Sequence, residues 1–171
     1  SWITDLPRDR FEVFAYYTGH VTDDFSTALS QSVERYRRLS GPAVPVADAV
    51  LADALDVLVY PDVGMDTASY LLAGMRLAPV QCAGWGHPVT TGQANIDCFL
   101  SCDAMEPAGA QSHYAERLVR LPGIGTRYAR PATPSPVTRA ALGLPQACPL
   151  FLCPQSLFKI HPDNDALLVE V

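Results

Sequence analysis

The chain has 171 residues, the length of one ordinary domain or of one domain and part of another. Hydrophobic residues make up 49% and charged residues 18%, which excludes a disordered chain, and the net charge of −6 excludes a broadly basic, nucleic-acid-binding surface. With no signal peptide and no apolar run long enough to cross a bilayer, we expect a cytoplasmic protein without a membrane partner.

The first hundred residues alternate short apolar runs with helix-period segments, which is typical of β-α units in a parallel sheet. Each helix is predicted from apolar residues three and four apart, and each strand from a β-branched or apolar run. In chain order the predictions are a strand over Phe11–Tyr17, a helix over Asp24–Arg38, a helix over Val46–Leu55, a strand over Asp56–Tyr60, a helix capped by Asp66 or Thr67 that ends before Pro79, a strand over Val80–Ala83 and a strand over Asp97–Ser101.

The remaining residues continue this alternation after one interruption. Arg130–Pro136 contains three prolines and predicts a stiff, extended linker between two domains. Around it, the predictions are a helix over Pro107–Tyr114, a strand over Arg117–Leu121, a helical turn over Val137–Leu142, a strand over Leu150–Cys153 and a helix from Pro162. The five cysteines lie mostly in apolar runs with no zinc-site spacing, so we expect reduced core thiols and no metal site.

One candidate site is the loop over residues 84–92, which follows a predicted strand and contains glycines, hydroxyls and His87. Ligands of open parallel sheets bind where strands end, and glycine lets a backbone approach a ligand closely. The alternative is that the glycines and Pro88 only shape a turn and that Thr90 and Thr91 satisfy local backbone groups. Nearby, Asp62 is a weaker acid/base candidate, and Asp66 fits a helix cap better.

A second candidate site is the loop over residues 153–162, which contains Lys159. A lysine just ahead of a helix that starts at Pro162 can add its charge to the helix dipole and bind a pyrophosphate. The alternative is a solvated surface lysine, which is what most lysines are.

At these two loops the sequence resembles the catalytic region of bacterial O-linked N-acetylglucosamine transferases and SPINDLY-like proteins, which are family 41 glycosyltransferases. The order of the motifs is more specific than any one of them. The matching segments are Gln81–Gly92, Ile96-Asp97, Cys102-Asp103, Tyr114–Leu118 and Phe158–Pro162.

The resemblance implies an α/β fold of the GT-B type, in which two Rossmann-like domains face a cleft. Residues 1–130 would form most of the first domain, incomplete at its start. Residues 131–136 would be the linker, and residues 137–171 the first β-loop-α unit of the nucleotide-sugar-binding domain, truncated at its end. Tetratricopeptide repeats are expected upstream in the parent chain.

The resemblance also implies transfer of N-acetylglucosamine from UDP-N-acetylglucosamine to a protein Ser/Thr hydroxyl, with inversion and without a metal or other cofactor. Positive charge must then stabilise the leaving diphosphate. Lys159 matches the family's phosphate-contacting lysine, with Gln155 and Ser156 as further donor-binding candidates. The matching cleft loop supplies Gly86, His87, Pro88, Thr90 and Thr91, and His87 is the other catalytic candidate.

Two departures keep alternatives open. Ser156 stands where the family often has glutamine, with Gln155 one place earlier, and Phe158 replaces a tyrosine found in some members. The alternatives are a SPINDLY-type protein O-fucosyltransferase that uses GDP-fucose, or a non-catalytic module that binds sugar nucleotides or proteins. We expect the 171-residue chain alone to bind UDP weakly and to transfer no sugar.

Overall fold

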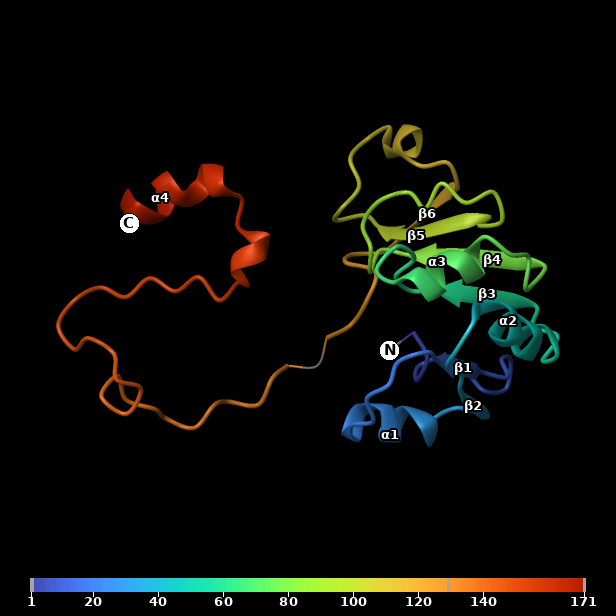
Figure 1. Cartoon of the computed structure of the whole chain (residues 1–171), viewed down its shortest axis with the longest axis horizontal. Helices are drawn as coiled ribbons and strands as arrows, with labels where there is room; N and C mark the ends of the chain where they lie inside the picture. Colours follow the sequence, from blue (N-terminus) through green and yellow to red (C-terminus); the bar gives the residue numbers. More distant parts are fainter. Residues whose placement is uncertain (1, 129, 171) are drawn as a thin grey trace. The chain divides into compact units, whose positions relative to one another are not determined.

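A computed structural model describes residues 2–128 and 130–170, and its chain divides before Arg130 into two units (Figure 1). All strands of the described residues lie in the first unit. The elements of this unit are β1 (Phe14–Tyr17), α1 (Asp24–Ser30), β2 (Arg35–Arg38), α2 (Ala43–Leu51), β3 (Val57–Tyr60), α3 (Thr67–Ala73), β4 (Val80–Gly84), β5 (Cys98–Cys102), the 3-10 helix η1 (Ala110–His113) and β6 (Arg117–Leu121).

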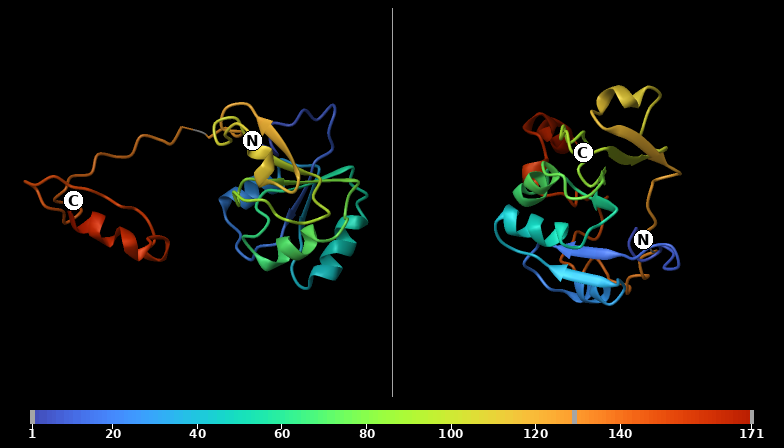
Figure 2. Two further views of the ribbon diagram at one scale, coloured as in Figure 1. Left: turned by 90° about the horizontal axis from the view of Figure 1, so that it is seen from above. Right: turned by 90° about the vertical axis from the view of Figure 1, so that its right-hand side faces the viewer.

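The strands of the first unit form two parallel sheets, β1-β2 and β3-β4-β5-β6. In the larger sheet Val57 lies opposite Val80, and Cys98 lies between Cys82 and Arg117. Helices α2 and α3 contact each other and lie on one face of the sheets (Figures 1 and 2). The predicted α/β class with a parallel sheet is confirmed, and the carboxyl ends of β3 to β6 share one edge of the larger sheet.

The core lies between the larger sheet and the two helices. Phe99, Ala83 and Ala73 are fully buried there, because short apolar strands pack against the apolar faces of α2 and α3. Strand β3 is covered on one face only. Val57 and Val59 are 53% and 40% exposed, since β3 is an edge strand and its outer face is uncovered.

Helix α3 begins as the sequence predicts. Asp66 is its N-cap, and the carboxylate accepts a hydrogen bond from the backbone N–H of Ser69 at 2.9 Å. Helix α1 begins with a reciprocal capping box between Asp23 and Ser26. Both caps satisfy backbone donors that the first turn of a helix leaves unpaired.

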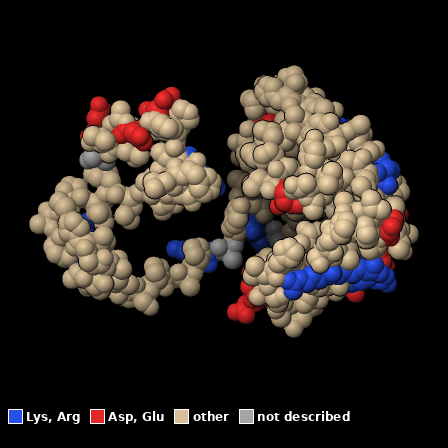
Figure 3. Space-filling view, in the orientation of Figure 1, with Lys and Arg blue, Asp and Glu red and all other residues tan. Residues whose placement is uncertain are grey.

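The predicted helix over Asp24–Arg38 is wrong in its second half. The helix ends at Ser30, and Arg35–Arg38 forms β2, parallel to β1. Phe25, on the predicted apolar face, is 76% exposed. The basic side chains of β2 instead form a stripe on the surface (Figure 3), and two of them reach the buried carboxylate of Asp53.

Two other predictions of regular structure need correction. The helix predicted over Pro107–Tyr114 is only the short η1, because Gly109 adopts a left-handed conformation with φ of +82° just before it. The second unit has no strand over Leu150–Cys153 among its described residues; Phe151 and Leu152 are 70% and 74% exposed. An isolated strand without a neighbour leaves its backbone groups unpaired and is not stable.

The second unit contains short helical segments instead. The predicted helical turn over Val137–Leu142 appears as a turn over residues 139–143, in which the Leu142 N–H donates to the carbonyl of Thr138 at 3.3 Å. The predicted helix start at Pro162 appears as a 3-10 turn with proline in its first turn. The segments are η2 (Leu157–Lys159), η3 (Pro162–Asn164) and α4 (Asp165–Glu170). Within residues 2–128 and 130–170, no helix has the length and apolar character needed to cross a membrane.

Candidate functional site

The carboxyl edge of the larger sheet brings together the loops that follow β3, β4 and β6. The backbone N–H of Gly86 donates to the carbonyl of Pro61 at 2.9 Å, which joins the first two loops. A Cβ at Gly86 would lie 2.6 Å from that carbonyl oxygen, so only glycine fits this close approach. In parallel sheets this edge is where ligands bind.

His87 lies at this edge, half-buried against the β3 loop. Its ring atom Cδ2 is 2.8 Å from the position that a Cβ would take on Gly64, whose φ is +102°. Glycine at position 64 therefore makes room for the imidazole. The structure thus brings Gly86 and His87, both predicted site residues, to the edge where a ligand of a parallel sheet is expected, with Pro88 exposed beside them.

Two carboxylates stand in the β3 loop and differ in their surroundings. Burial, together with the charge of Asp66, raises the pKa of Asp62 above its usual range. Burial acts in the same direction on Asp66, but hydrogen bonds from Ser69 outweigh it and lower the pKa. Asp66 is therefore occupied as a helix cap, whereas Asp62 is the carboxylate of this loop whose pKa is raised.

Thr90 and Thr91 contact a residue that sequence analysis did not single out for a role. The Thr90 hydroxyl donates to Oε2 of Glu116 at 2.7 Å. The Thr91 backbone N–H donates to Oε1 of Glu116 at 2.8 Å, and the Thr91 hydroxyl donates to the same oxygen. Glu116 immediately precedes β6, so these bonds lie toward the amino end of that strand, away from the edge where His87 lies.

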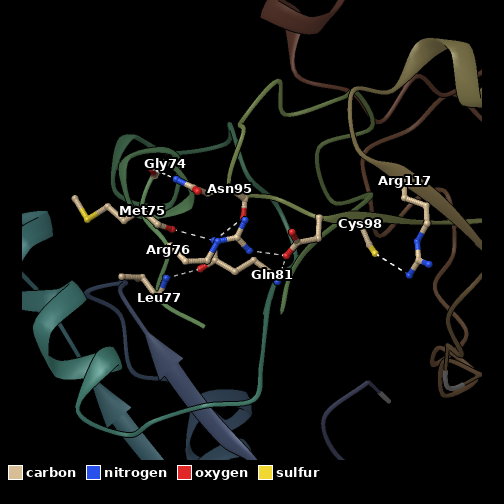
Figure 4. A network of polar contacts seen from close by, with 9 residues as sticks. Gly74, Met75, Arg76, Leu77, Gln81, Asn95, Cys98 and Arg117 are labelled. Atoms are coloured by element: carbon tan, nitrogen blue, oxygen red, sulfur yellow. Dashed lines mark hydrogen bonds and ion pairs between the residues drawn. The ribbon is translucent and has the colours of Figure 1, made fainter. Parts of the chain in front are cut away.

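The β4–β5 loop, residues 85–97, is also fixed at its far end (Figure 4). The side chain of Gln81 is fully buried; its amide donates to the carbonyls of Met75 at 2.9 Å and Asn95 at 2.7 Å, and its oxygen accepts from Leu77 N–H at 2.8 Å. Because both the NH₂ group and the oxygen of the Gln81 side chain are hydrogen-bonded, this side chain connects the loop to the segment before β4. A polar residue inside the apolar Val80–Gly84 run was the sequence signal for this role.

A shallow hollow of about 180 Å³ lies beside Gly86 at the carboxyl edge. Trp2, Pro61, Trp85 and Tyr128 form its mostly apolar wall, and Trp2 Nε1 donates to the carbonyl of Gly125 at 2.7 Å. Ligand sites for drug-sized molecules usually measure about 300–1,000 Å³. The hollow is therefore smaller than a typical site for a drug-sized ligand.

The predicted donor-binding residues Gln155, Ser156 and Lys159 lie together in the second unit. Lys159 ends η2, and its ammonium lies 5.9 Å from the centre of the Phe158 ring. Oε1 of Gln155 accepts from the backbone N–H of Ser156 at 2.9 Å. Among residues 2–128 and 130–170, Lys159 forms no ion pair with a carboxylate.

No group of three or more His, Cys, Asp and Glu residues gathers into a metal site among the residues that the structure describes. All five cysteines are free thiols in the structure, and three of them, Cys82, Cys98 and Cys102, are buried. The expectation of a reaction without a metal stays a prediction.

No protein-family model matches the chain, but searches of known proteins and of solved structures find relatives, of which three proteins and one structure are described below. The chain is 24% identical over 165 residues, 91% of its length and 17% of the relative, to the probable UDP-N-acetylglucosamine–peptide N-acetylglucosaminyltransferase SEC of Arabidopsis thaliana. It is 36% identical over 93 residues, 53% of its length and 9% of the relative, to the probable UDP-N-acetylglucosamine–peptide N-acetylglucosaminyltransferase SPINDLY of Solanum lycopersicum.

The third relative is the UDP-glucose:protein N-beta-glucosyltransferase of Actinobacillus pleuropneumoniae, 33% identical over 66 residues, 39% of the chain and 10% of the relative. The solved structure is a mutant O-GlcNAc transferase of Thermobaculum terrenum. It matches with a TM-score of 0.62 and 26% identity over 70% of this chain and 23% of that chain. The chain thus spans between 9% and 17% of the length of the three relatives.

Proposed function

Because the chain is a relative, in sequence and in fold, of the O-GlcNAc transferase and SPINDLY-like glycosyltransferases, we propose that it is part of an inverting protein glycosyltransferase. The reaction is transfer of N-acetylglucosamine from UDP-N-acetylglucosamine to a protein Ser/Thr hydroxyl. The observation that supports it best is the SEC match, which extends over 91% of the chain. The fold class, α/β of the GT-B type, is confirmed by the structural match.

In this proposal the two loops have different tasks. The loop with Gly86 and His87 forms the wall of the cleft near the sugar and the acceptor, where backbone groups and the imidazole position the reacting atoms. The ammonium of Lys159 stabilises the negative charge that develops on the leaving diphosphate. A positioned cation that strengthens its interaction as charge develops lowers the barrier to transfer without help from a metal.

The donor is proposed to be a UDP sugar and not GDP-fucose. Each of the three relatives described above is named for a UDP sugar, either UDP-N-acetylglucosamine or UDP-glucose. UDP-glucose is therefore the second candidate donor. The cytoplasm as the location and tetratricopeptide repeats elsewhere in the parent protein remain part of the proposal.

Lys159 is the only lysine among these 171 residues, so a modified lysine peptide from this part of the protein reports on Lys159 alone. The experiment uses the full-length protein that contains these residues. Its lysines would be modified with an amine reagent, and modification of the peptide that contains Lys159 would be followed by mass spectrometry. UDP should slow the modification of Lys159, and GDP at the same concentration should have a much smaller effect. Equal modification with and without UDP would remove Lys159 from the donor site.

A matched pair of variants completes the test. Lys159→Ala should weaken UDP binding and lower transfer by about tenfold or more, because it removes a cation from the diphosphate. Arg130→Ala removes the same charge from the linker and should change neither. Unchanged UDP affinity in Lys159→Ala would contradict the assignment.

A further inference from the structure

The β4–β5 loop is a long connection for a parallel sheet. It joins β4 to β5 through residues 85–97 with no helix, whereas the connections β1–β2 and β3–β4 each contain one. Loops of about 12–15 residues without secondary structure are uncommon and are usually functional. Its first part holds Gly86 and His87 at the carboxyl edge, so whatever fixes the loop also fixes these two residues.

Glu116 is the residue that fixes the middle of this loop. It is only 3% exposed, and both of its oxygens accept hydrogen bonds from residues 25 or 26 positions earlier in the chain. Burial alone would raise the pKa of Glu116, but hydrogen bonds from Thr91 and Thr90 outweigh it and lower the pKa. The carboxylate is therefore ionised at neutral pH and binds two threonines with charge-assisted hydrogen bonds.

The backbone of Glu116 is fixed as well. Nε2 of Gln111 donates to the carbonyl of Glu116 at 2.9 Å, and Oε1 of Gln111 accepts from Leu118 N–H at 2.9 Å. The amide of Ala115 donates to the Thr90 hydroxyl at 3.1 Å. Glu116 is thus hydrogen-bonded to η1 and adjoins β6, and its carboxylate connects both elements to the β4–β5 loop.

The threonine hydroxyls have no proton left for a ligand. A hydroxyl carries one hydrogen, and Thr90 and Thr91 both donate theirs to Glu116. Each hydroxyl oxygen also accepts from the loop backbone: Thr91 from Gln93 N–H at 3.1 Å, and Thr90 from Gly92 N–H at 3.3 Å. These contacts favour a structural task for the two threonines over direct contact with a sugar.

The link from Thr90 back to His87 is short and stiff. Pro88 has a fixed φ, and Val89 N–H donates to the carbonyl of His87 at 3.0 Å, which closes a tight turn. A displacement of Thr90 therefore moves His87, whose ring lies against Gly64 at the other end.

We propose that Glu116 is a positioning residue, which holds Gly86 and His87 at the carboxyl edge by binding Thr90 and Thr91. The inference rests on the proposed function, in which this edge lines the reaction cleft. Glu116 itself does not contact the substrate. Its effect is on the geometry of the reacting groups, and a displacement of about 1 Å at such a site can slow a reaction by about a hundredfold.

The first test measures geometry in the 171-residue chain. Glu116→Gln keeps the shape of the side chain but places an amide against donors, so the Thr91 amide should exchange with solvent about tenfold faster or more. The NMR signals of the His87 ring should shift, while the Phe99 amide in the centre of the sheet keeps its exchange rate. Glu12→Gln, an exposed residue of the same unit, is the matched control and should change none of these.

Thr90→Val provides a second variant that keeps the charge of Glu116 and the bonds to Thr91. It should also shift the His87 signals, to a smaller extent. If both variants show the same His87 ring signals and the same Thr91 amide exchange rate as wild type, the proposal is overturned, whatever the activity of the protein.

The second test separates positioning from donor binding. In the polypeptide translated from the full reading frame, Glu116→Gln should lower kcat for transfer at least tenfold and leave the Kd for UDP unchanged. An unchanged kcat despite displaced His87 would show that the loop does not serve the reaction and would overturn the inference. A third outcome is that neither wild type nor any variant transfers sugar, although Glu116→Gln changes the His87 signals and the Thr91 exchange rate. The proposed function then fails, and the conclusion that Glu116 fixes the loop stands.

Discussion

Asp53 binds three side chains that lie far from it in the sequence. Its carboxylate is 1% exposed, accepts from Tyr16 OH at 2.7 Å and pairs with Arg35 at 2.9 Å and Arg37 at 3.0 Å. Burial alone would raise the pKa of Asp53, but hydrogen bonds from Tyr16 and Arg35 outweigh it and lower the pKa. One carboxylate thus fastens β1 and β2 to the turn after α2.

The stability that Asp53 contributes should depend on pH in a defined direction. Because its pKa is lower in the folded chain than the unfolded value of about 3.9, the contribution is complete above about pH 4 and is lost as the pH falls through the folded value. Asp53→Asn should destabilise the chain by about 1–2 kcal/mol at pH 7, a range reduced because both arginines are partly exposed.

Denaturant unfolding of wild type and Asp53→Asn across pH 7 to pH 3 checks this prediction. The difference in the free energy of unfolding should stay constant down to about pH 4.5 and shrink below pH 4. Asp48→Asn, on the exposed side of α2, should differ little from wild type at any pH. A difference that grows on acidification would contradict the account.

At the scale of elements, the sequence predicted a helix or strand correctly where the residues that determine it are close together in the sequence. β6 has the predicted bounds, and α3 begins at the predicted cap, Asp66, because a cap and a β-branched strand depend on adjacent residues. β2 was missed because its partners are β1 and Asp53, which a window of sequence does not contain. Periodicity then favoured one long helix over a helix and a strand.

The candidate site was predictable to a similar degree. Glycine and histidine after a strand identified Gly86 and His87, and the structure places both at the carboxyl edge. The contacts of Thr90 and Thr91 with Glu116 were not predictable, because 25 residues separate them and the resemblance assigned no role to Glu116. Long-range carboxylate contacts leave no periodic signal in a sequence.

The exposed edge strand β3 leads to a prediction about association. Val57 is 53% exposed at the edge of the larger sheet, and apolar edge strands favour pairing between chains. Val57→Lys should reduce concentration-dependent association in sedimentation experiments and change the free energy of unfolding by less than about 0.5 kcal/mol. Val63→Lys, which buries the new charge at a position 2% exposed, should unfold the chain; association equal to wild type in Val57→Lys would contradict the prediction.

At the scale of the whole molecule, the two units contribute different kinds of residue to the proposed reaction. The first unit has a packed core and holds Gly86 and His87 on a loop fixed at Pro61, Glu116 and Gln81. The second unit has no buried side chain among its described residues, and its exposed Lys159 ends η2. In the proposed function the donor contacts extend beyond these residues, which is why we expect the 171-residue chain alone to bind UDP weakly.

Sugar transfer itself is the most direct test of the central claim. The polypeptide translated from the uninterrupted reading frame would be incubated separately with UDP-N-acetylglucosamine, UDP-glucose and GDP-fucose and a mixture of Ser/Thr peptides, and the products identified by mass spectrometry. The account predicts addition of N-acetylhexosamine to a hydroxyl from the first donor, and a decrease of about tenfold or more in this activity in Lys159→Ala. Binding of UDP without transfer from any of the three donors would contradict it and identify a non-catalytic module.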